Sequence, residues 1–170
     1  MITIRTETSD DVSAIDDLLD LAFAFDAHSR QNEAAIVRKL RESDALLLSL
    51  LAVDDQAECV GYIAFSPVTI QDGSPGGISD WVGLGPMAVN PRLQRRGIGR
   101  ELIQAGLAEI TARRAAGCVV LGEPGFYERF GFKTMENLIL PGALAPFFLA
   151  RSFNSPAPSG QVEYHPAFRI

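Results

Sequence analysis

The segment from Leu84 to Arg100 constrains the fold more than any other part of the chain. It begins as an apolar run ending at Val89, continues through a short arginine-rich loop, and ends where a helix is expected to begin. Gly97 and Gly99 bracket Ile98 where that helix is expected to begin. The first turn of a helix leaves backbone N–H groups without partners, and the helix dipole adds partial positive charge there. The pattern therefore predicts a strand–turn–helix unit whose turn attracts an anion.

Four arginines crowd this turn, although the chain as a whole is acidic, with a net charge of -6. They are Arg92, Arg95, Arg96 and Arg100. Basic side chains together with free N–H groups at a helix N-terminus favour phosphate or pyrophosphate. The acidic balance of the rest argues against nucleic acid as a partner, because non-specific binding of nucleic acid needs a broad basic surface.

Apolar periodicity predicts short helices and strands around this unit. Strands are expected at Ile2–Arg5, Leu46–Val53, Cys59–Val68, Asp80–Val89, Cys118–Leu121, from Phe132 onward and around Phe147–Ala150. Helices are expected from a cap at Ser9 to Ala22, through Ala35, Ile36 and Leu40, at Gly97–Arg114 and at Gly125–Arg129. The second and third strands form an antiparallel hairpin, and the long helix joins two parallel strands. The expected fold is α/β, with a mixed, mostly antiparallel sheet and helices on both faces.

Pro86 lies inside the strand expected at the centre of the sheet, where a missing N–H is normally excluded. Proline is tolerated there if one edge of the strand has no partner. We therefore expect the two parallel strands to splay apart near Pro86, which leaves free backbone groups in a cleft beside the turn. An ordinary bulge without function is the alternative interpretation.

The length of 170 residues and an apolar content of 47% predict one domain spanning residues 1–170. Cys59 and Cys118 lie in apolar runs and are expected to be buried thiols, with no disulfide and no metal-binding spacing. The first residues show no leader peptide, and the longest apolar run, Ala45–Val53, is too short to cross a bilayer. We expect a cytoplasmic protein without a metal or a membrane partner.

The two commonest nucleotide-binding glycine motifs do not fit the turn. A P-loop has Lys and then Ser or Thr after its second glycine, whereas Arg100 and Glu101 stand here. A dinucleotide fingerprint has a third small residue three positions after Gly99, and that position is Leu102.

Two motifs of the chain resemble those of the GNAT superfamily of N-acetyltransferases. The first is Met87-Ala88-Val89-Asn90-Pro91 followed by Gln94-Arg95-Arg96-Gly97-Ile98-Gly99-Arg100, and the second is Val119-Val120-Leu121-Gly122-Glu123-Pro124-Gly125-Phe126-Tyr127-Glu128-Arg129-Phe130-Gly131-Phe132. They occur in the order that the family has. The tail, with Pro141–Leu144 and Val162–Phe168, looks like a small bacterial subgroup of predicted acetyltransferases.

The resemblance implies a GNAT-like sheet with a splayed parallel pair, and acetyl-CoA as the co-substrate. The diphosphate would bind the N–H groups from Arg95 to Arg100, with Arg95 and Arg96 as charge partners. A Cβ at Gly97 or Gly99 would hold the phosphate away or clash with the turn. The pantetheine arm would pair with the free strand edge, where one N–H would hold the oxyanion. The implied cofactor-binding residues are Met87, Ala88, Val89, Gln94, Arg95, Arg96, Gly97, Ile98, Gly99 and Arg100.

The resemblance also makes Tyr127 the candidate general acid, which would protonate the departing thiolate. The family often has asparagine just after the short strand, whereas this chain has Gly122-Glu123-Pro124. Glu123 is therefore a candidate for that contact, for the general base, or simply for a favourable helix start. Asp80, Glu33 and His28 are further base candidates, and a chain of waters is another; His165 is interpreted as a structural residue of the tail.

The implied reaction is transfer of an acetyl group to a primary amine, by direct attack in a ternary complex. The acceptor is a small molecule or a protein amine, and its site is expected between the loops at Phe25–Gln31 and Gln71–Ser79 and the C-terminal tail. A homodimer is left open. The alternative is a regulatory or scaffold module that binds CoA or acyl-CoA without turnover.

Overall fold

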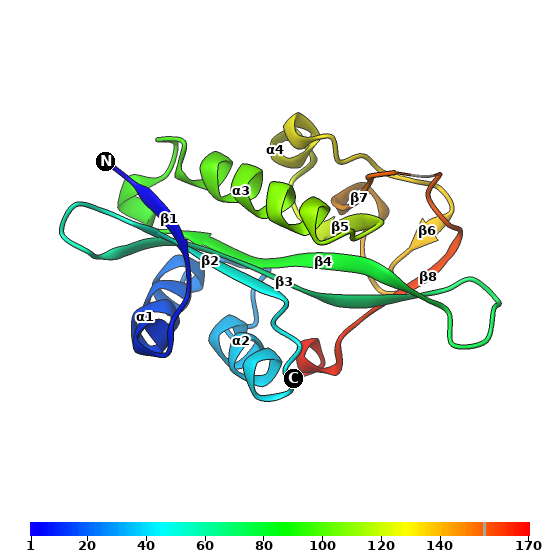
Figure 1. Cartoon of the computed structure of the whole chain (residues 1–170), viewed down its shortest axis with the longest axis horizontal. Helices are drawn as coiled ribbons and strands as arrows, with labels where there is room; N and C mark the ends of the chain where they lie inside the picture. The colour runs from blue at the N-terminus through cyan, green and yellow to red at the C-terminus, as the bar shows by residue number, and fades with distance from the viewer. Residues whose placement is uncertain (155) are drawn as a thin grey trace.

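A twisted eight-stranded sheet forms the centre of the computed structural model, which describes residues 1–154 and 156–170 (Figure 1). The strands are β1 Thr3–Thr6, β2 Leu48–Val53, β3 Cys59–Gln71, β4 Ile78–Val89, β5 Gly117–Leu121, β6 Leu138–Ile139, β7 Phe148–Ser152 and β8 Gly160–Tyr164. The helices are α1 Val12–Phe23, α2 Glu33–Glu42, α3 Ile98–Ala112 and α4 Pro124–Tyr127.

The strand order confirms a mixed, mostly antiparallel sheet. Neighbours along the main path run β1-β2-β3-β4-β5-β7, and β8 pairs with both β3 and β6. The β2–β3 hairpin is antiparallel, whereas β4 and β5, which α3 joins, are parallel. A second parallel pair, β6 with β8, was not predicted.

Helices cover both faces of the sheet (Figure 1). On one face, α3 buries Ile98, Leu102 and Ile103 in a core cluster that also contains Tyr127 of α4. On the other face, α1 buries Ile15 and other apolar side chains in a separate cluster. The C-terminal turn, Pro166–Phe168, packs on α2 at this second face.

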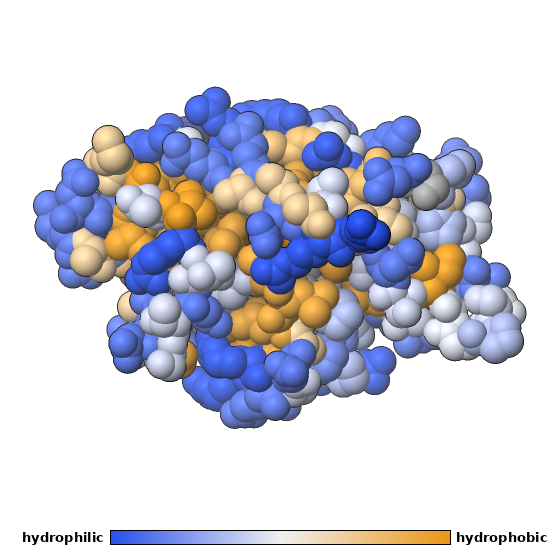
Figure 2. Space-filling view, viewed as in Figure 1, coloured by the Kyte–Doolittle hydropathy of each residue, from blue (hydrophilic) through white to orange (hydrophobic). Residues whose placement is uncertain are grey.

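The surface agrees with this layering. In Figure 2, hydrophilic residues cover most of the outer surface, and apolar residues come to the surface along the seams between the helices and the sheet. No helix within residues 1–154 and 156–170 is long and apolar enough to cross a bilayer.

The start of α1 differs from the expectation that Ser9 caps it. Thr8 caps a 3-10 turn, Ser9–Asp11, and Asp11 is the N-cap residue of α1, which begins at Val12. The Asp11 carboxylate accepts the backbone N–H of Thr8 at 2.7 Å and is also held by Arg5 at 2.8 Å. This is a capping box, with Asp in place of the usual Glu or Gln.

Two further expectations need correction. The strand expected from Phe132 is reduced to a single bridge between Lys133 and Ala150, because Gly131 at φ 85° turns the chain and Phe132 buries its ring in the α3-side core. Cys118 is fully buried as predicted, but Cys59 is only half-buried; both are free thiols.

The close contact between α3 and β3 can be tested by mutation of glycines in α3. A Cβ on Gly106 of α3 would lie 2.5 Å from the fully buried Phe65 ring, whereas a Cβ on Gly99 would meet atoms only at 3.5 Å and beyond. We expect Gly106→Ala to lower the free energy of unfolding by roughly 1–2 kcal/mol, because overpacking outweighs the gain in helix propensity.

Gly99→Ala is the matched control in the same helix. It should be neutral or stabilising by up to about 1 kcal/mol, because its side chain has room. Urea unfolding of both variants measures the difference, and a Gly106→Ala protein more stable than the wild type would contradict the close contact.

Candidate functional site

The parallel strands β4 and β5 part in the middle of the sheet. Their pairing ends at Leu84 with Val120, while β4 continues to pair with β3 as far as Val89. Gly85 and Pro86 form a bulge opposite Ala64, and the Gly85–Pro86 peptide bond is cis. The predicted splay and the alternative bulge are therefore both present, at the same point.

The backbone of β4 beyond Leu84 presents specific groups to the gap. The N–H of Asn90 donates to Val60 on β3, and hydrogen-bonding direction alternates along a strand. The N–H and C=O of Ala88 therefore face β3, whereas those of Met87 and Val89 face the open edge. Ala88 was predicted to contribute backbone groups to this edge, and the register does not support that part of the prediction.

The turn after β4 aims a row of N–H groups outward. Asn90 accepts the N–H of Arg92 at 3.0 Å, and Gly97 adopts φ 88° before α3 begins. The first backbone bond into the helix runs from Glu101 to Gly97 at 3.0 Å. Among the described residues, the N–H groups from Arg95 to Arg100 have no hydrogen-bond acceptor. They are available to an external anion.

The arginines of the turn are exposed. In the described part of the chain, none of them forms an ion pair with an acidic side chain, so all are free to bind an anion. They are Arg92, Arg95, Arg96 and Arg100. Gly97 has a positive φ that favours glycine, but the expected clash of a Cβ at Gly99 with the turn is wrong, since that Cβ would lie at ordinary contact distances, 3.5 Å from the Phe126 ring and 3.7 Å from Val89. The other part of the prediction, that a Cβ at Gly99 would hold a phosphate away, stays a prediction.

Tyr127 lies beside the splay at the end of α4, only 8% exposed. A Cβ on Gly122 would lie 2.5 Å from its ring, so the ring packs on the backbone just after β5. Phe126 and Phe132 contact it edge-on, with centroids 5.1 and 5.9 Å away. Burial raises the pKa of the Tyr127 phenol, and nearby Cys118 adds to the shift. Among the described residues its hydroxyl has no hydrogen-bond partner.

The base candidates are spread over the molecule. Glu123 is exposed at the start of α4, where its carbonyl accepts the N–H of Tyr127 at 3.1 Å. Asp80 is exposed and is separated from the splay by the paired segment 81–84. His28 and Glu33 lie at the α1–α2 connection, where the Glu33 carboxylate accepts the Ser29 hydroxyl. Of these candidates, only Glu123 is close to Tyr127 in the chain, at the start of the same short helix.

His165 takes the structural role expected of it. Its Nδ1 accepts the N–H of Ala167 at 3.0 Å and caps the C-terminal turn. The preceding residue, Tyr164, received no role from sequence, yet β8 brings its ring onto Gly83 of β4. The signal that could have identified this strand is the short alternation of Val162 and Tyr164.

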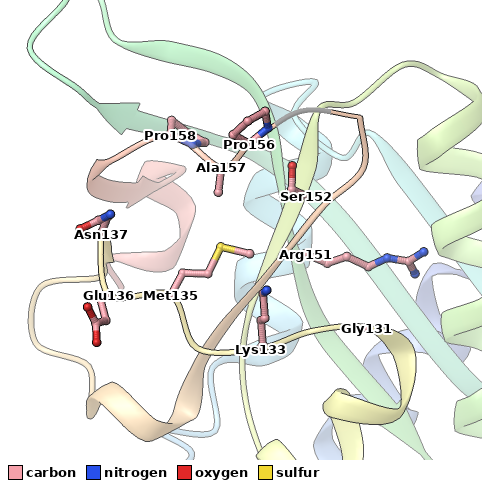
Figure 3. A pocket seen from close by; sticks show the side chains of 10 residues that line it. All are labelled: Gly131, Lys133, Met135, Glu136, Asn137, Arg151, Ser152, Pro156, Ala157 and Pro158. Carbon is pink, nitrogen blue, oxygen red and sulfur yellow. The ribbon is translucent and has the colours of Figure 1, made fainter.

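Two cavities lie away from the splay. One, of about 530 Å³, is lined by Lys133, Met135, Pro158 and neighbours; Figure 3 shows the Lys133 and Met135 side chains pointing into it and the Arg151 guanidinium pointing away. The other, of about 590 Å³, lies between α3 and the segment after α4. Neither includes the turn or Tyr127. Across residues 1–154 and 156–170, no cluster of three His, Cys, Asp or Glu side chains is suited to a metal ion.

Comparison with known proteins matches this geometry. The model of the acetyltransferase (GNAT) domain family matches residues 48–134, which include β4, the turn, α3, β5 and α4. An uncharacterised N-acetyltransferase of Escherichia coli, YhbS, is 37% identical over 171 residues, covering 97% of each chain.

Solved structures extend the match to nearly the whole chain. A GNAT family acetyltransferase from Brucella melitensis, in complex with acetyl-CoA, has a TM-score of 0.86 and 41% identity, covering 99% of this chain and 98% of that one. E. coli YhbS in complex with CoA has a TM-score of 0.87 and 35% identity, covering 99% and 92%. The chain therefore belongs to the GNAT family of acetyltransferases.

Proposed function

We propose that this protein acts as one domain that transfers the acetyl group of acetyl-CoA to a primary amine, by direct attack in a ternary complex. One observation carries the proposal: a turn of free N–H groups, an open strand edge and a buried phenol meet at the end of the β4–β5 pairing. The similar proteins from Brucella melitensis and Escherichia coli, in complex with acetyl-CoA and CoA, support the choice of donor.

In this proposal, the turn and the open strand edge position acetyl-CoA. The diphosphate accepts the N–H groups between Arg95 and Arg100, and the exposed Arg95 and Arg96 add charge-assisted bonds. The pantetheine arm carries amides like a peptide and pairs with the backbone of Met87 and Val89 as an added strand. The thioester then lies at the splay, between the turn and Tyr127.

The chemistry follows from that placement. The neutral amine attacks the thioester carbonyl carbon, and the negative charge that develops on the oxygen is held by a β4 N–H at Met87 or Val89. The C–S bond breaks as the carbonyl re-forms. Tyr127 gives its proton to the departing thiolate; since its pKa is raised, the phenol carries that proton at neutral pH. The proton of the amine leaves through water or Glu123, the base candidate closest to Tyr127 in the chain.

A ligand titration followed by turnover tests the proposal. Thermal shifts are measured with acetyl-CoA, CoA and ATP, and free thiol is then followed with n-butylamine, spermidine, lysine amide and an alanyl peptide as acceptors. Stabilisation by both CoA species but not ATP, with thiol release, is the expected result. No stabilisation by CoA would overturn the donor site, and stabilisation without thiol release would favour a binding module.

Gly97→Glu should weaken acetyl-CoA binding about 100-fold, because a carboxylate replaces space beside the diphosphate and charge-assisted bonds worth roughly 2–3 kcal/mol are lost. Isothermal titration measures the dissociation constant. Gly76→Glu is the matched control, because Gly76 also has a positive φ, of 77°, and is exposed away from the turn. Equal affinities of the two variants would refute the diphosphate site.

Tyr127→Phe should lower kcat about 10- to 100-fold and leave the acetyl-CoA dissociation constant unchanged, because the ring keeps its packing and only the proton donor is lost. The effect is moderate because a thiolate leaves readily. Tyr62→Phe is the control: Tyr62 is buried on the other face and bonded to Ser49 at 2.9 Å. Steady-state kinetics at saturating acetyl-CoA separate the two, and an unchanged kcat in Tyr127→Phe would remove the acid role.

A further inference from the structure

A second phenol reaches the splay from the other face of the sheet. Tyr127 belongs to the core cluster with Val82 and Val120, whereas Tyr164 packs with Trp81 and Val119. Side chains alternate between faces along β4 and β5, so the two tyrosines lie on opposite faces. Figure 1 shows the same division: α4 lies on the α3 side, and the chain after β8 continues to the α2 side.

The ring of Tyr164 is held over the last residues of β4 that pair with β5. Tyr164 lies opposite Val68 in the β3–β8 pair, and its ring extends to β4, where a Cβ on Gly83 would be 2.5 Å from Cε1. Gly83 pairs with Val119, one residue before the pairing ends. The ring of Phe168 lies 5.1 Å away at 31°. The phenol is thus fixed next to the opening of the splay.

Two hydroxyl groups near Gly83, those of Ser66 and Tyr164, form no hydrogen bond with the described residues. Ser66 pairs with Gly83, so its side chain is on the Tyr164 face; it is fully buried, and its hydroxyl has no partner among the described residues. Tyr164 is half-buried, and its hydroxyl forms no hydrogen bond with the described residues. Beside Gly85, a Cβ would meet no atom within 4 Å, so there is open space at the start of the splay. A buried hydroxyl without a partner, at Ser66, together with a nearby phenol and free space indicates a site for a polar group.

The electrostatic environment keeps Tyr164 neutral. Burial raises the pKa of its phenol, and nearby Cys118 and Tyr127 act in the same direction. A neutral phenol can both donate and accept a hydrogen bond. A neutral amine offers N–H donors as well as the lone pair that must attack the carbonyl carbon.

We propose that Tyr164 binds the acceptor amine: its phenol oxygen accepts an N–H of the amine, which approaches the thioester from the face opposite Tyr127. The lone pair of the nitrogen is left free to point at the carbonyl carbon, and Ser66 lines the same space. This inference rests on the proposed acetyl transfer and extends it, since it separates the donor side of the splay, at α3 and α4, from the acceptor side, at β8.

Tyr164→Phe tests the inference, because it removes the hydroxyl and keeps the ring against Gly83 and Phe168. The acceptor is whichever of n-butylamine, spermidine, lysine amide and the alanyl peptide the wild type acetylates fastest. We expect kcat/KM for that amine to fall at least tenfold, with no change in melting temperature or in acetyl-CoA affinity. Tyr62→Phe is the matched control and should leave kcat/KM for the amine within twofold of the wild type.

Gly83→Ala provides an independent variant, because its methyl group displaces the Tyr164 ring; it should lower kcat/KM for the amine in the same way. An unchanged kcat/KM in Tyr164→Phe would overturn the role of Tyr164 while acetyl transfer stands. A matching loss of acetyl-CoA affinity would also overturn it, because the phenol would then serve the donor. A wild type that acetylates none of the amines would instead refute the proposed function itself.

Discussion

The end of the β4–β5 pairing at Leu84 is the constraint on which the site depends. Pro86 has no N–H to offer a neighbour, and the Gly85–Pro86 bulge turns β4 away from β5 while β3 still holds it. One edge of β4 is thereby left with backbone groups that the fold does not satisfy. Free backbone groups in the interior of a sheet are costly unless a ligand or water pairs with them, which is why the proposed donor site is placed at this opening.

Helix α3, which follows the turn, limits the kind of ligand that fits the opening. Positive φ at Gly97 turns the chain sharply from β4 into α3, and the contact of Gly106 with Phe65 presses α3 onto the sheet. The unpaired N–H groups of the turn therefore lie beside the open edge of β4. A ligand that binds both the N–H groups of the turn and the open edge of β4 needs an anionic group and an extended arm with amides. In the proposed function, the turn and the strand edge therefore bind two parts of one ligand.

Features set by local chemistry were predictable from sequence, and features set by long-range register were not. The turn and the splay follow from Gly97, Pro86 and the adjacent arginines, which lie within one short segment. The orientation of the Ala88 backbone depends on which β3 residue it faces, and β8 depends on pairing between 68–71 and 161–164. A five-residue strand carries too little periodicity to reveal such pairing, so the position of Tyr164 had no clear signal. Asp80 was an equally local choice, and the paired segment 81–84 separates it from the splay.

A gap between parallel strands differs from a surface groove because it opens on both faces of the sheet. Tyr127 borders it on one face and Tyr164 on the other, so two reactants can meet inside the sheet without competing for one entrance. The distribution of charge agrees with separate donor and acceptor sides. Four exposed arginines lie at the turn, whereas the chain as a whole carries a net charge of -6. In the proposed reaction, the arginines of the turn would attract an anionic donor and repel a cationic amine, which agrees with an approach of the amine from the β8 side. In this proposal, the separation of β4 from β5 determines both where the acetyl group would lie and from which face the amine would arrive.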